Sequence, residues 1–158
     1  MQQSTSACNR PEDTAGYWVT TVMKPDGTPV PATAMKAYYR TDVPASQVKP
    51  IPLGLMIVAG NHAATAANPQ STNVVHWSCK NRVTGEVTGP WVQPHQCESP
   101  DAKPRLKIRF PQCWDGRRLD SPDHKAHTAY PKRVNGVYKC PGTPCGYHAP
   151  RVAIQLSR

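Results

Sequence analysis

Residues 106–110 read Leu-Lys-Ile-Arg-Phe, so apolar and basic side chains alternate along this segment. Successive side chains of a β-strand point to opposite faces of its sheet. The segment therefore predicts a half-buried strand with Leu106, Ile108 and Phe110 directed inward. Residues 149–156, near the end of the chain, show the same alternation and predict a second strand of this kind.

Four further segments are expected to form strands. Each is rich in aromatic and β-branched residues or is apolar throughout, and they are residues 17–23, 35–40, 53–59 and 74–79. Residues 53–59 are the most apolar run and are expected to be the most buried strand. Residues 25–29 have the composition of a turn, since Pro fixes φ, Asp caps the turn and Gly accepts positive φ.

The composition agrees with short strands and long loops. The chain has 158 residues, enough for one domain, and its 18 prolines and 10 glycines exclude long helices. We predict an all-β fold, a single-domain antiparallel β-sandwich or irregular barrel stabilised by disulfides. This domain is expected to span residues 15–158 and to follow a mobile segment at residues 1–14.

The cysteine count predicts disulfides formed in an oxidising compartment. Six cysteines allow 15 pairings, and none of them forms the paired C-x-x-C motif of zinc sites. We favour Cys79 with Cys97, which closes a hairpin-like segment, and Cys113 with Cys140. Cys8 and Cys145 then remain for a third bond.

The formal charge of +9 suits an anionic polysaccharide, an acidic cell surface or nucleic acid, and it also suits solubility alone. The basic residues are scattered along the sequence, with no RNA-binding aromatic motif, zinc finger or basic helix. Nucleic acid is therefore not the expected partner. No apolar run is long enough to span a membrane, and the first residues lack the features of a signal peptide.

Residues 110–131 concentrate the chemistry of the chain, and we call them the central segment. Asp120, Asp123, His124 and His127 fall within eight positions, and Pro122 prevents one regular helix from running through them. Two imidazoles and a carboxylate could hold a divalent metal through Asp120, His124 and His127. The same four residues could instead act as catalytic acids and bases, or the aspartates could cap a turn while the histidines make structural hydrogen bonds.

Substrate contacts are expected from Trp114, Arg117, Lys125 and Tyr130. Trp114 is expected to be partly exposed for stacking on a sugar ring, whereas Trp18 and Trp77 are expected to be buried. The three glutamates lie in segments without an ordered, aromatic context, so any catalytic carboxylates are expected to be aspartates. Cys113 and Ser121 lack the context of a catalytic nucleophile.

Several motifs resemble one protein family. They are Cys-Trp-Asp-Gly at 113–116, Leu-Asp-Ser-Pro-Asp-His-Lys-Ala-His-Thr-Ala-Tyr-Pro at 119–131, and matching pieces at 15–18, 38–40, 55–61, 76–79 and 140–141. Together they resemble DUF1996, a domain of unknown function found in secreted fungal and actinobacterial proteins. The resemblance implies an extracellular or cell-wall location. It also implies an upstream segment with paired histidines, after which this chain begins, so we expect an N-terminally truncated domain.

The sequence thus predicts an extracellular, monomeric, carbohydrate-active domain that acts on a polysaccharide or cell-wall glycan. The alternative is a non-catalytic module that binds a cell wall or polysaccharide. Enzyme and binding module are both left open at this stage.

Overall fold

A computed structural model describes residues 15–142, 147–148 and 151–157 of the chain, with side chains for residues 15–142. The described ranges contain β-strands and one short 3₁₀ helix, Ala45–Gln47, so the predicted all-β class is confirmed. The chain forms two compact units, Met1–Pro31 and Ala32–Arg158. Within the described ranges, no helix has the length and apolar character needed to cross a membrane.

The first unit contains one short hairpin, formed by β1 (Val22–Met23) and β2 (Pro29–Val30). Its turn is as predicted. The backbone N–H of Thr28 donates to Asp26 Oδ1 at 2.8 Å, and Gly27 has a φ of 80°, which glycine adopts without steric cost.

The strand predicted at residues 17–23 is shortened to its last two residues, because β2 offers only two partner residues. Trp18 is consequently 74% exposed, and the prediction that it is buried is wrong.

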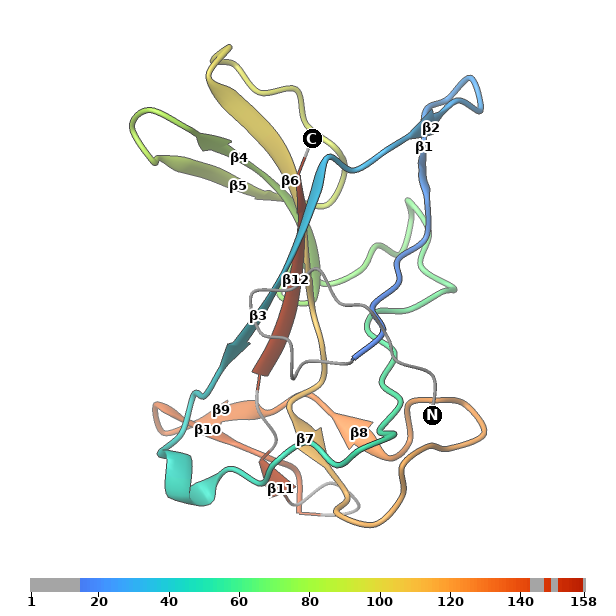
Figure 1. The fold of residues 1–158 in the computed structure, drawn as a ribbon, viewed down its shortest axis with the longest axis vertical. Helices are drawn as coiled ribbons and strands as arrows, with labels where there is room; N and C mark the ends of the chain where they lie inside the picture. The colour runs from blue at the N-terminus through green and yellow to red at the C-terminus, as the bar shows by residue number, and fades with distance from the viewer. Residues whose placement is uncertain (1–14, 143–146, 149–150, 158) are drawn as a thin grey trace. The chain divides into compact units, whose positions relative to one another are not determined.

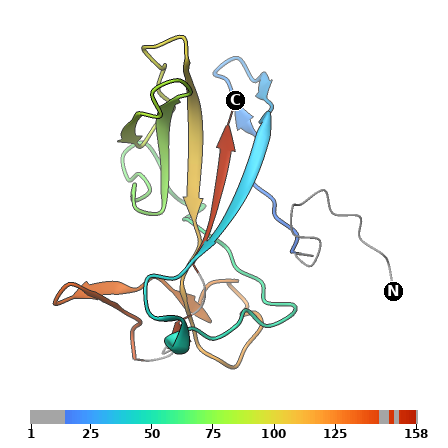
Figure 2. The same ribbon diagram turned by 60° about the vertical axis from the view of Figure 1, so that its left-hand side comes forward.

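The second unit is built on a five-stranded antiparallel sheet (Figures 1 and 2). Its strands match the segments predicted at 35–40, 74–79, 106–110 and 149–156. In spatial order they are β3 (Ala34–Arg40), β12 (Arg151–Ser157), β6 (Ala102–Arg109), β4 (Val75–Asn81) and β5 (Val87–Trp91).

Strand pairing sorts the side chains of this sheet into two faces. Leu106 lies opposite Trp77 on one side and Leu156 on the other, so these positions share an apolar face. Leu106 and Cys79 on this face belong to the small buried core. Lys107 lies opposite His76 and therefore belongs to the other face.

Smaller strands follow β6 along the chain. β7 (Cys113–Trp114) pairs with β8 (Thr128–Ala129) and β11 (Tyr147–His148) in a three-stranded sheet. β9 (Lys132–Val134) and β10 (Val137–Lys139) form a separate hairpin. The sheets of the described residues do not close into a barrel.

The strand predicted at residues 53–59 is wrong. This segment joins no sheet, and Leu53 is 91% exposed rather than buried. Its backbone instead pairs with the central segment, since the N–H of Met56 donates to the carbonyl of Leu119 at 2.9 Å. An apolar run can therefore act as a support for a loop as well as a strand in a sheet.

Two disulfides confirm the predicted pairings. Cys79 bonds Cys97, and Cys113 bonds Cys140, with Cα–Cα distances of 5.7 and 5.6 Å. The first ties the loop after β5 to β4, and the second ties β7 to the residue that follows β10. Cys8 and Cys145 lie outside the described residues.

Candidate functional site

The two ends of the central segment are bonded to each other. The N–H of Asp115 donates to the carbonyl of His127 at 3.0 Å, and the N–H of Gln112 donates to the carbonyl of Ala129 at 3.1 Å. These bonds belong to the pairing of β7 with β8. The polar residues predicted from the sequence therefore lie on a loop that is closed at its base.

Asp115 holds the first turn of this loop. Its carboxylate is buried, and it accepts the backbone N–H groups of Arg117 and Arg118 at 2.9 and 3.0 Å and Arg118 Nε at 2.7 Å. Burial acts to raise the pKa of Asp115, but the hydrogen bonds from Arg118 and Arg117 outweigh it and the pKa is lowered. Asp115 is thus an ionised structural carboxylate.

His127 is fully buried, with 0% of its surface exposed. Its Nε2 lies 2.7 Å from the carbonyl oxygen of Met56, and its Nδ1 lies 2.8 Å from Ser121 Oγ. A carbonyl oxygen only accepts hydrogen bonds, so Nε2 carries the proton and donates. Both ring nitrogens are therefore occupied, and His127 ties the loop to residues 56–60.

Asp123 caps the turn that carries His124. Its Oδ1 accepts hydrogen bonds from Ser121 Oγ at 2.8 Å, from the N–H of Ala126 at 2.9 Å and from the N–H of Lys125 at 3.1 Å. The bond from Ala126, followed by those from Ser121 and Lys125, strongly lowers the pKa of Asp123. The capping role that the sequence left open for the aspartates is the one Asp123 has.

His124 and Asp120 form an exposed pair. His124 Nδ1 lies 2.7 Å from Asp120 Oδ1 and 2.9 Å from Oδ2, and 53% of the His124 side chain is exposed. The hydrogen bond from His124 is the largest cause of the lowered pKa of Asp120. Because the carboxylate can only accept, Nδ1 is the donor, and Nε2 of a neutral His124 is left as a base.

The backbone of His124 is unusual. Its φ of 55° lies in the left-handed region, which is unfavourable for residues with a Cβ and is often found at functional sites. The loop imposes this conformation, because the His124 N–H donates to the carbonyl of Ser121 at 2.7 Å and Asp123 caps the next residues. This geometry brings the imidazole back onto Asp120.

The four predicted catalytic residues thus separate into two groups. Asp120 and His124 form the exposed pair. The exposed Asp123 and the buried His127 both bond Ser121 Oγ, and we call the residues whose hydrogen bonds hold the loop in shape its frame. Of the donors predicted for a divalent metal, His127 has both ring nitrogens in hydrogen bonds within the protein. No group of three His, Cys, Asp or Glu side chains in the described ranges is placed to hold a metal ion. The exposed Asp120–His124 pair has the geometry of an acid–base pair.

The predicted substrate contacts have different surroundings. Lys125 Nζ donates to the carbonyl of Gly60 at 2.8 Å, and the Tyr130 hydroxyl donates to the carbonyl of Arg109 at 2.8 Å. Burial raises the pKa of Tyr130 to about 12. Both residues therefore contribute their polar atoms to the frame, while the side chain of Arg117 is exposed.

Trp114 is partly exposed, as predicted, and its Nε1 donates to the carbonyl of Arg118 at 2.7 Å. This hydrogen bond fixes the orientation of the indole. Trp77, which the sequence placed in the core, is only half-buried.

Residues 56–60 are the part of the site that the sequence did not reveal. The carbonyls of Met56 and Gly60 accept from His127 and Lys125, across more than sixty positions of sequence. Carbonyl groups are common to every residue, so no sequence pattern could have identified these two.

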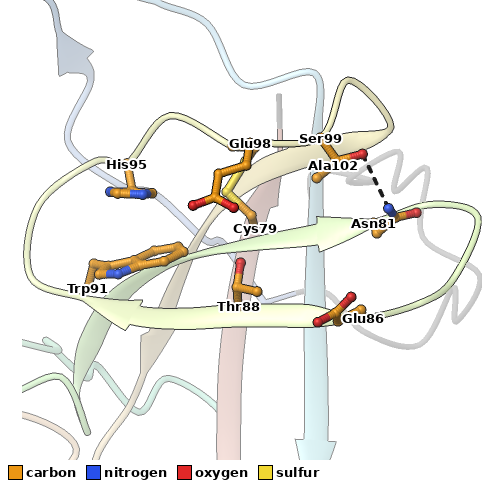
Figure 3. Close-up of a pocket in the computed structure, with 10 residues that line it drawn as sticks. Cys79, Asn81, Glu86, Thr88, Trp91, His95, Glu98, Ser99 and Ala102 are labelled. Carbon is orange, nitrogen blue, oxygen red and sulfur yellow. Dashed lines mark hydrogen bonds between the residues drawn. A yellow bond between two sulfur atoms is a disulfide. The ribbon is translucent and has the colours of Figure 1, made fainter.

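Away from the central segment, a hollow of about 190 Å³ lies where β4, β5 and the loop after β5 meet (Figure 3). Glu86 and Glu98 line it together with Trp91, whose ring stacks on His95 with centroids 4.2 Å apart. The expectation that the glutamates lack an ordered, aromatic context is therefore wrong for these two. Strand pairing places Glu86 opposite Asn81, whose N–H donates to the Glu86 carbonyl at 2.9 Å, while the Cys79–Cys97 disulfide holds the loop that carries Glu98.

Comparison with known proteins bears on the whole chain. The model of a family described as a domain of unknown function (DUF1996) matches residues 1–157. No curated protein and no solved structure matches the chain. The match includes the central segment with its exposed Asp120–His124 pair and extends over both compact units, and the chain therefore belongs to the DUF1996 family.

Proposed function

We propose that the protein is an extracellular, carbohydrate-active enzyme that acts on an anionic polysaccharide, with His124 as its general base and Asp120 as the residue that orients it. The observation that carries this proposal is the exposed pair, in which Asp120 fixes Nδ1 of His124 at 2.7 Å and leaves Nε2 directed away from that bond. Two disulfides support an oxidising, extracellular setting.

The aspartates argue against hydrolysis by two carboxyl groups. That mechanism needs a protonated carboxylic acid, whose pKa must be raised, beside an ionised carboxylate. Asp115, Asp120 and Asp123 all have lowered pKa values because each accepts hydrogen bonds. None of them can supply the acid near neutral pH.

Elimination beside a uronate requires a base of the kind that His124 provides. Nε2 takes the proton from the carbon next to the uronate carboxylate, the electron pair forms a carbon–carbon double bond, and the glycosidic C–O bond breaks. The departing oxygen takes a proton from solvent. The exposed Arg117 is available to neutralise the uronate carboxylate, which makes that carbon more acidic.

The test is a panel of uronate-containing and neutral polysaccharides, followed by ultraviolet absorbance of the unsaturated product and by chromatography of fragments. We expect cleavage of a uronate polymer, reduced by at least about 100-fold in His124→Ala and by a smaller factor in Asp120→Asn. His62→Ala, at another exposed histidine, is the matched control. Cleavage that is equal in His124→Ala and the wild type would exclude His124 as the base.

The alternative function is binding without cleavage, and it is favoured by the partly exposed, oriented indole of Trp114. In that case the same panel yields a bound polysaccharide and no fragments. Binding would then fall in Trp114→Ala and remain unchanged in His124→Ala.

A further inference from the structure

The lysines and arginines of β3, β4 and β6 all occupy one face of the five-stranded sheet. β3 and β6 contain them at same-face positions, and pairing with β4 and β12 aligns these positions across the sheet. None of the five strands contains Asp or Glu. We call this the basic face, and its members are Lys36, Arg40, Lys80, Lys103, Arg105, Lys107 and Arg109.

The register defines the rows of this face. Lys107 lies opposite His76, and on its other side the β12 position Gln155 lies opposite both Lys107 and Lys36. In the row nearer the β4–β5 turn, Lys103 lies opposite Lys80. Directly opposed residues of antiparallel strands share a face, so basic residues of β3, β4 and β6 lie on it together. Strand pairing thus brings onto one face basic residues that are scattered along the sequence.

The spacing of these charges suits an extended polymer. Same-face residues of one strand are about 7 Å apart, and neighbouring strands are about 4.8 Å apart. The four basic residues of β6, from Lys103 to Arg109, consequently follow a line of about 20 Å. A polyanion bound along this line would lie close to all four positive charges.

The pKa of His76 responds to the positive charges of this face. Burial is the largest cause of its lowered pKa, and the positive charges of Lys107 and Arg109 lower it further. The carbonyl of Thr72, 2.7 Å from Nδ1, acts in the opposite direction.

We propose that the basic face binds one chain of an anionic polysaccharide along β6, and this inference deepens the proposed function by giving its substrate a binding surface. β6 ends at Arg109, directly before the central segment begins at Phe110. The Tyr130 hydroxyl of that segment donates to the Arg109 carbonyl, so the end of β6 is bonded to the loop that carries His124. A polymer bound along β6 is thereby led toward the Asp120–His124 pair.

Polysaccharide is favoured over nucleic acid by the side chains of this face. Proteins that bind single strands without sequence preference stack successive bases on aromatic rings. Among the described side chains of the five strands, this face contains two rings, Tyr38 on β3 and the half-buried His76 on β4, since Tyr39, Trp77 and Trp91 occupy the other face. The basic face therefore offers a row of charges without a run of stacking rings.

The test compares two double variants that each remove two positive charges. Lys36→Gln/Lys107→Gln changes one row of the basic face, whereas Lys132→Gln/Lys139→Gln changes a directly opposed, exposed pair on the β9–β10 hairpin. Binding to polygalacturonate is measured by calorimetry at several salt concentrations. We expect about five- to tenfold weaker binding at low salt for the sheet variant, a shallower salt dependence, and little change for the hairpin variant.

Two further measurements make the result decisive. Lys36→Arg/Lys107→Arg keeps the charges and should bind as the wild type does, which separates charge from folding. Equal losses in the sheet and hairpin variants would overturn the proposal, because only net charge would then matter. Tighter binding to single-stranded DNA than to polygalacturonate at matched salt would also overturn it.

His124→Ala separates this inference from the proposed function. The basic face predicts that this variant binds polygalacturonate as the wild type does while cleavage is lost. If the sheet variant binds normally and His124→Ala alone loses cleavage, the basic face is wrong and the proposed function stands.

Discussion

His127→Ala should be far more destabilising than His124→Ala, although both histidines lie within four positions of the same loop. His127 is fully buried and joins Ser121 Oγ to the Met56 carbonyl through bonds of 2.8 and 2.7 Å. The His124 side chain is exposed, and it bonds the carboxylate of Asp120.

The magnitude follows from these contacts. Removing the ring leaves the Met56 carbonyl without its donor, which costs about 1–3 kcal/mol when water cannot replace it. The space left by the imidazole adds about 2 kcal/mol, near the lower end of the range for large-to-small substitutions. The expected loss in the free energy of unfolding is about 3–5 kcal/mol for His127→Ala and within about 0.5 kcal/mol for His124→Ala.

Urea unfolding followed by tryptophan fluorescence provides the measurement, since Trp114 lies in the same loop. His127→Gln is the informative third variant, because an amide can donate to the Met56 carbonyl and should restore part of the loss. If His127→Ala unfolds within about 1 kcal/mol of the wild type and yet abolishes cleavage, the assignment of His127 to the frame is refuted. His127 would then have a direct part in the chemistry.

Three other outcomes are expected. Replacing Cys113 and Cys140 together with serine should lower the free energy of unfolding by about 3.5 kcal/mol in denaturant titrations, since the bond closes 27 residues; a change under about 1 kcal/mol would contradict it. The His76 pKa, followed by NMR, should lie below 6.5 and should rise in Lys107→Gln. The stability that neutral His76 contributes is therefore present above pH 6.5 and is lost as the pH falls through the folded pKa. An unchanged pKa in the variant would contradict the effect of the Lys107 charge on His76. Asp123 has a lowered pKa, so its stabilising contribution is present above about pH 4 and is lost as the pH falls through the folded pKa. In Asp123→Asn the melting temperature should therefore fall less steeply as the pH is lowered below about 4. An unchanged dependence of the melting temperature on acid pH would count against the capping role.

Strand positions were predictable where a side-chain alternation was long enough. Residues 106–110 alternate apolar and basic side chains, and this pattern survives in β6, where Leu106 is buried and the basic residues of the opposite face are half-buried. The same reasoning failed at residues 53–59. An apolar run without alternation carries no information about its partners, and here those partners are a buried imidazole and a loop carbonyl.

The candidate site was predictable as a set of residues and not as an arrangement. Four acidic and imidazole groups within eight positions identified the loop, because such a polar cluster in an otherwise ordered, aromatic segment has little use in a core. Which of them face solvent depends on one backbone conformation. The positive φ of His124 directs its ring to Asp120, while His127, three positions later, points inward to Met56.

The sequence by itself determined the all-β class, the presence of disulfides and the loop in which the chemistry lies, since alternation, proline content and cysteine count are properties of the chain. Tertiary structure alone decided which residues act together. Strand register gathered basic residues from β3, β4 and β6 on one face. His127 is buried and bonds the Met56 carbonyl, more than sixty positions away, while His124 is exposed to solvent. Such neighbours are fixed by pairing and packing between distant segments, and the local pattern of either segment does not contain that information.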